Sequence, residues 1–118
     1  MEELPEEILD LHLVYMPPSL WACLIRKEFY KDIELVDEVF NDTDCIWRLK
    51  LCANSFCYIP DLVYIHNSYP ESVSGTIQRD KYCFSLFHIF ELLQDFVLSN
   101  NFSPKIIKRF YTYKFIKL

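Results

Sequence analysis

The feature that most restricts this chain is its near-complete lack of glycine. Gly75 is the only glycine among 118 residues. Loops that cradle phosphate groups need several glycines in a short run, so Walker and dinucleotide-binding motifs are excluded. Any nucleotide that this protein handles must be held by another kind of element. At this length the chain forms one domain at most, and an apolar fraction of 52% is enough to build a core.

Charge is distributed unevenly along the chain. All 17 acidic residues lie between Glu2 and Asp95, whereas the segment from Ser103 to Leu118 has five basic residues and no acidic one. Basic side chains alternate there with aromatic and aliphatic ones. Such a tail can be an amphipathic helix that contacts an anionic membrane, or a helix that packs by its aromatic side. The acidic body argues against nucleic acid as a partner.

The first residues and the cysteines indicate a reducing compartment. The chain begins Met1-Glu2-Glu3, which is the wrong charge for a secretory signal. No apolar run reaches the roughly 18 residues that a membrane span needs. Five cysteines occur without a CxxC pair, which favours buried free thiols. We therefore expect a cytoplasmic location, with the basic tail as a means of peripheral contact at the inner face of the membrane.

Apolar periodicity predicts a chain that is rich in helices with a few short strands, and therefore α+β by content. Helices are expected where apolar residues repeat at three and four positions, at residues 5–13, 43–53, 78–98 and 105–118. The longest of them, near residues 78–98, has the broadest apolar face. Two or three short strands are expected between the helices: one that starts at residue 20 and runs into a short helix at 27–31, and two at 56–59 and 62–66.

Two carboxylates lie at the predicted start of the helix at 43–53. Asp42 and Asp44 are placed to receive backbone N–H bonds and the positive end of the helix dipole. A carboxylate in a cleft can take a proton from a substrate hydroxyl. Capping by Asn41 or Asp42 explains the same residues without any chemistry. Arg48 can pair with Asp44, one turn back.

One histidine follows a predicted strand. His66 can ligate a divalent metal through one ring nitrogen, or it can be a polar strand end. The other histidines, His12 and His88, lie in apolar helical surroundings and are interpreted as packing residues.

The order of these residues is more specific than any one of them. The series runs Arg26-Lys27, Asp37-Glu38, Asn41-Asp42-Thr43-Asp44, Arg48, Tyr58-Ile59-Pro60-Asp61, His66 and Ser72. It resembles the acceptor half of family-2 glycosyltransferases with the GT-A fold. The resemblance implies an α/β class for the chain, as the helix-rich C-terminal portion of a GT-A-like nucleotide-sugar transferase domain. In that family an E-D-x-D stretch opens a helix with an Arg, and strands ending in Pro-Asp and in His follow. The resemblance covers roughly residues 18–75, with Asn41 where the family usually has Glu.

This resemblance implies roles for five residues. Asp42 matches the catalytic base, which deprotonates the acceptor hydroxyl for attack on the anomeric carbon of a nucleotide sugar. Asp44, Arg48 and Trp21 are assigned to substrate binding, although both tryptophans, Trp21 and Trp47, are favoured as core residues. His66 matches a position that contacts the metal or the diphosphate. A divalent ion, Mg²⁺ or Mn²⁺, is expected in the complete enzyme.

The resemblance also implies that the chain is only part of an enzyme. Residues 1–118 are expected to be a single partial domain, with an acceptor-side part at 1–75 and a helical extension with the basic tail at 76–118. Family members bind the nucleotide sugar with earlier strands and a D-x-D motif, which nothing ahead of Pro17 supplies. We expect a fragment that is inactive alone and that self-associates or pairs with a donor-half chain. The alternative is a non-enzymatic helical interaction module whose acidic body and basic tail dock on partners.

Overall fold

Helices alone make up the regular structure of the described residues. The computed structural model describes residues 4–15, 19–53, 55–61, 64–76 and 78–118. The long helices are α2 (Asn41–Cys52), α4 (Arg79–Ser99) and α5 (Pro104–Lys117). The short ones are α1 (Glu6–Asp10), the π-helix η1 (Leu11–Tyr15), the 3₁₀ turns η2 (Leu20–Ala22) and η3 (Lys27–Tyr30), and α3 (Val73–Thr76).

The predicted α/β fold, in which the chain is part of a GT-A-like domain with short strands, is wrong for the described residues. Residues 56–59 and 64–66 are extended but belong to no ladder, and residues 62 and 63 lie outside the described part. Residues 20–22 form the turn η2, in which the Cys23 N–H donates to the Leu20 carbonyl at 3.1 Å. An extended segment becomes a strand only when a neighbouring segment pairs with its backbone groups. The β-branched and aromatic residues of these segments correctly predicted an extended backbone. Their composition could not show that no second segment pairs with it.

The long helices lie where periodicity predicted them. In α4 the side chains of Ile89, Leu93 and Val97 repeat every four residues, and all three are fully buried. Helix α5 begins with Pro104 at its first position. Proline is tolerated there because the first N–H groups of a helix have no partner inside it. The short helix expected at 27–31 is the turn η3.

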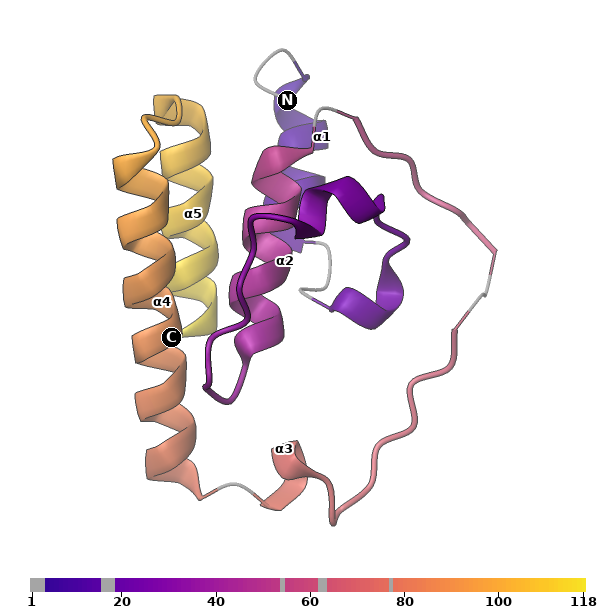
Figure 1. Cartoon of the computed structure of the whole chain (residues 1–118), viewed down its shortest axis with the longest axis vertical. Coiled ribbons are helices and arrows are strands. Elements are labelled where there is room, and N and C mark those ends of the chain that lie inside the picture. The colour runs from indigo at the N-terminus through magenta and orange to yellow at the C-terminus, as the bar shows by residue number, and fades with distance from the viewer. Residues whose placement is uncertain (1–3, 16–18, 54, 62–63, 77) are drawn as a thin grey trace.

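The core lies where the long helices meet α1 and η1. Figure 1 shows α4 and α5 side by side, with α2 and α1 next to them. One buried cluster joins all of these elements, and its members are Leu9, Leu13, Trp47, Leu51, Ile89, Phe90, Leu93, Val97, Ile106, Phe110 and Tyr113. Trp47 lies near its centre, with its ring 5.0 Å from that of Tyr113 and 5.8 Å from that of Phe110. The core therefore takes residues from both sides of residue 75.

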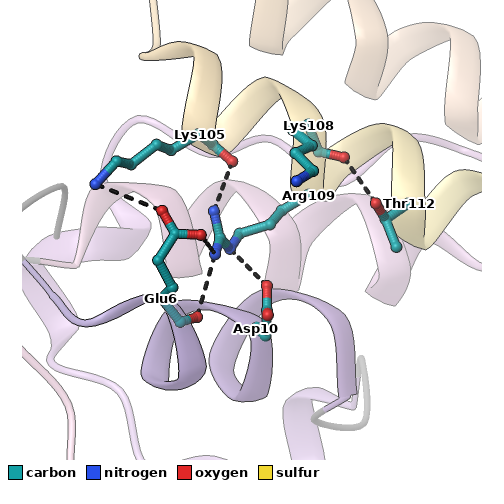
Figure 2. A network of polar contacts seen from close by, with 6 residues as sticks. All are labelled: Glu6, Asp10, Lys105, Lys108, Arg109 and Thr112. Atoms are coloured by element: carbon teal, nitrogen blue, oxygen red, sulfur yellow. Dashed lines mark hydrogen bonds and ion pairs between the residues drawn. The ribbon is translucent and has the colours of Figure 1, made fainter.

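A buried arginine fastens α5 to α1. Arg109 is 3% exposed. Its Nη2 lies 2.8 Å from Glu6 Oε2, its Nε lies 2.8 Å from Asp10 Oδ1, and its Nη1 donates to the Lys105 carbonyl at 3.0 Å. Figure 2 shows the guanidinium enclosed by these groups. The Arg109 side chain, by hydrogen bonding and then by its charge, lowers the pKa of Glu6. Because a buried charge is costly unless paired, this network fixes how the tail helix docks.

The remaining features concern thiols, membrane and connections. All five cysteines are unpaired, as predicted, but only Cys45 is buried, and Cys52, Cys57 and Cys83 are exposed. Within the described ranges, no helix combines the length and apolar character that a membrane span requires. Residues 55–61 and 64–69, which lie between α2 and α3, run as a wide arc outside the helices (Figure 1), and we call them the extended arc.

Candidate functional site

The first turn of α2 presents Asp42. The helix starts at Asn41, and Phe40, with a φ of 70°, occupies the position before it without a side-chain cap. The expectation that Asn41 or Asp42 caps the helix is therefore wrong. Asp42 lies inside the first turn, partly exposed, and its Oδ1 accepts the Thr43 N–H at 2.9 Å. This position leaves the carboxylate near the positive helix end and within reach of solvent.

Asp44 and Arg48 satisfy each other. Asp44 is only 1% exposed, and its two oxygens accept from Arg48 Nε at 2.8 Å and Arg48 Nη2 at 2.9 Å. The pairing predicted one turn apart on the helix is confirmed. The Arg48 guanidinium also lies 4.6 Å from the centre of the Phe96 ring on α4. The bidentate pair lies within α2, and the contact of Arg48 with Phe96 joins α2 to α4. A substrate could use Asp44 or Arg48 only by displacing one from the other.

Trp21 and His66, which are 45 positions apart, lie together on the surface. The rings of Trp21 and His66 stack at 4.7 Å with an interplanar angle of 22°, and Tyr64 stacks on the same indole at 4.9 Å. We call these three residues the aromatic stack. Trp21 is 44% exposed, so the expectation that it belongs to the core is wrong, whereas Trp47 is fully buried as expected. The stack attaches the extended arc to the segment of η2.

The structure relates the aromatic stack to Asp42 only through α2. The turn η2, which contains Trp21, packs against α2, whose first turn contains Asp42. No hydrogen bond, ion pair or ring contact joins Asp42 to Trp21 or His66, all three of which are described. Among the described residues there is also no group of three or more His, Cys, Asp or Glu arranged to hold a metal ion. The metal-binding role of His66 stays a prediction.

His12 and Lys50 form a buried basic pair that the sequence pattern did not predict. His12, correctly interpreted as a packing residue, stacks on Phe56 at 3.8 Å with an angle of 3°. Burial, and then the charge of Lys50, lowers the pKa of His12 to about 4. Burial also lowers the pKa of Lys50 to about 8. Lys50 follows Trp47 and Ile46 at helical spacing on the apolar side of α2, and this was the available signal of its burial.

Comparison of the chain with protein-family models, with curated proteins and with solved structures gives no match. A functional assignment therefore depends on the residues and the geometry described above. The predicted site residues lie on η2, on α2 and on the extended arc, and the aromatic stack is the exposed group that the structure assembles from them.

Proposed function

We propose that this chain is the acceptor-binding part of a glycosyltransferase. In the complete enzyme a sugar would pass from a nucleotide-sugar donor to a saccharide or lipid-linked acceptor. The donor site, with its divalent metal, would lie outside these 118 residues, and the chain alone would be inactive. This function does not require the α/β architecture, because its residues lie on helices and on the extended arc.

The observation that carries the proposal is the exposed aromatic stack. The C–H bonds on one face of a pyranose ring are weakly positive, and the face of an aromatic ring is negative. An indole that keeps 44% of its surface exposed while Tyr64 and His66 hold its orientation is suited to receive a sugar ring. Side chains that are pre-oriented lose less entropy when a ligand binds.

Asp42 would act as the general base of the transfer. Its partly exposed carboxylate would accept the proton of the acceptor hydroxyl while that oxygen attacks the anomeric carbon. The first turn of α2 places the Asp42 carboxylate near the positive end of the helix dipole. Asp44 and Arg48 would hold that turn in place through their mutual pair instead of contacting the acceptor.

Binding of the acceptor can be tested with the chain itself. Because Trp47 is fully buried and Trp21 is not, quenching of tryptophan fluorescence by acrylamide reports mainly on Trp21. A panel of saccharides should include one that protects Trp21 from the quencher. Trp21→Ala and His66→Ala should abolish or weaken binding in calorimetry, and Leu24→Ala, at an exposed neighbouring position, should not. No protection by any saccharide, or binding unaffected by Trp21→Ala, would contradict the proposal.

The base is tested in the complete enzyme. Asp42→Asn should lower kcat by roughly two to four orders of magnitude while acceptor binding is retained. Asp37→Asn, at an exposed acidic position ahead of α2, is the matched control and should leave kcat unchanged. Equal transfer rates in the Asp42 and Asp37 variants would remove Asp42 from the mechanism.

A second candidate is a non-enzymatic interaction module. Its specific support is the extended arc, where Ile59 and Ile65 and the tyrosines 58, 64 and 69 are all exposed. Apolar side chains gathered in one exposed segment are typical of a surface that binds another protein. Retention of a partner protein by the chain, lost when Ile59 and Ile65 are changed to Ser but kept in Trp21→Ala, would favour this function over sugar transfer.

A further inference from the structure

Helix α5 has two apolar sides, and only one of them enters the core. Ile106, Phe110 and Tyr113 are buried, whereas Phe115 on the opposite side is 87% exposed. The exposed side repeats at helical spacing. Its members, which we call the outer stripe, are Lys108, Tyr111, Phe115 and Leu118. Packing within the chain does not account for an aromatic and basic stripe that faces solvent.

Helix α4 borders an open hollow on the surface of the described part of the chain. It measures about 740 Å³ and is lined by Glu38, Lys81, Phe84, Ser85, Phe87, His88 and Glu91. We call it the α4 hollow. Phe84 is 75% exposed there, and the hydroxyl of Ser85 donates to Glu38 Oε2 at 3.1 Å, which holds the rim against α4. Figure 1 shows α4 continuing past the C-terminal end of α5, so α5 of the same chain leaves the first turns of α4 uncovered.

The outer stripe and the α4 hollow complement each other in charge and in apolar character. Helix α5 has five basic residues and no acidic one. Two of the five, Lys105 and Arg109, already pair with Glu6. Lys108 lies beside the exposed aromatic residues of the outer stripe. If the stripe of one molecule were placed in the α4 hollow of another, Lys108 could pair with a carboxylate there.

The α4 hollow supplies both kinds of contact. Glu38 and Glu91 face Lys81 and His88 within it, and His88 Nδ1 lies 3.9 Å from Glu91 Oε2. Phe84 and Phe87, which are also among its lining residues, are exposed and aromatic, like Tyr111 and Phe115 of the outer stripe.

We propose that the occupant is a second copy of this chain. In a two-fold dimer each copy would place its outer stripe in the α4 hollow of the other, which closes the assembly because both surfaces are used in both copies. A second copy accounts for both surfaces at once. An anionic membrane would fit the basic stripe but would be repelled by the carboxylates of the hollow. This dimer is independent of the proposed sugar transfer.

Sedimentation velocity on the full chain tests the proposal from low to high micromolar concentration. The wild type should dimerise, and Phe115→Ser and Phe84→Ser should each weaken the dimer roughly thirtyfold, as expected for aromatic anchors of an interface. Leu24→Ser, at a position that is 96% exposed and away from both surfaces, should leave dimerisation unchanged. Circular dichroism of each variant checks that the helices are retained.

Charge exchange identifies the pairing. Lys108→Glu and Glu91→Lys should each weaken the dimer, a mixture of the two variants should associate more tightly than either alone, and high salt should weaken the wild type. A wild-type monomer at high micromolar concentration would overturn the proposal. So would a dimer that is indifferent to both phenylalanine substitutions. A monomer that sediments with vesicles rich in anionic lipid, in a manner that depends on Phe115, would assign the outer stripe to a membrane instead.

Discussion

The buried imidazole of His12 should make the fold sensitive to acid. His12 is 7% exposed, and its pKa falls from 6.5 to about 4 because burial, and then the charge of Lys50, disfavours the protonated ring. Above pH 6.5 the ring is neutral in the folded and the unfolded chain. Between pH 6.5 and about 4 only the unfolded chain binds the proton, so the free energy of unfolding falls as the pH falls. Below about pH 4 both states are protonated and the loss stops.

The size of this effect follows from the displacement of the pKa. Each pH unit corresponds to about 1.4 kcal/mol, so the whole window removes about 3 kcal/mol of stability. That is a large part of the stability of a typical small domain. Protonation would also charge a ring that stacks on Phe56, so the start of the extended arc should loosen with it.

Urea unfolding followed by circular dichroism measures this contribution. His12→Gln replaces the titrating ring by a neutral amide, so its free energy of unfolding should change less between pH 6.5 and 4 than that of the wild type, by about 3 kcal/mol. His88→Gln makes the same replacement at an exposed histidine and is the matched control. Carboxylates titrate in the same range, and comparison of the two variants removes their shared contribution. The reasoning is refuted if His12→Gln shows the wild-type slope, or if NMR finds that His12 titrates at its ordinary pKa.

Two further predictions concern the other buried cations. Arg109→Met should destabilise the chain by about 1.5–3 kcal/mol because Glu6, Asp10 and the Lys105 carbonyl lose the guanidinium that joins them; Lys105→Met, at a half-exposed side chain, should leave the denaturation midpoint unchanged, and equal effects of the two would disprove the role of the network. The pKa of Lys50 falls from 10.5 to about 8, so the folded chain releases this proton first and stability should rise by about 3 kcal/mol as the pH increases through that window. Lys50→Met should lack this rise in alkaline urea titrations, and its persistence would show that another group is responsible.

The helices were predictable because their signal is local. Residues such as Ile89, Leu93 and Val97 repeat at the helical period, and the repeat alone places them on one side of α4. The same applies to the pair Asp44 and Arg48, which lie one turn apart and were expected to meet. Strands carry a weaker local signal, because their hydrogen bonds depend on a second segment. The arc at 55–61 and 64–69 has the composition of strands, but no segment in the described part of the chain forms a ladder with its backbone.

The candidate site was only partly predictable for the same reason. Trp21 and Trp47 are the same residue type, and both were expected in the core. Trp47 has apolar neighbours at helical spacing and is buried, whereas the position of Trp21 depends on its stacking with His66, 45 positions away. Helical spacing indicated that His12 and Lys50 each lie on an apolar side of a helix, but only the packing of the helices showed that the two are buried near each other.

By itself, then, the sequence determined the helical period of the long elements, the absence of glycine-rich phosphate loops and the basic character of the tail. The tertiary structure decided that no sheet forms in the described residues, that Trp21 is a surface residue and that Arg109 is not part of a solvated tail. Arg109 meets Glu6 across 103 positions of the chain. Periodicity reflects interactions over one or two turns, whereas burial of a charge depends on which distant groups the packed helices bring to it.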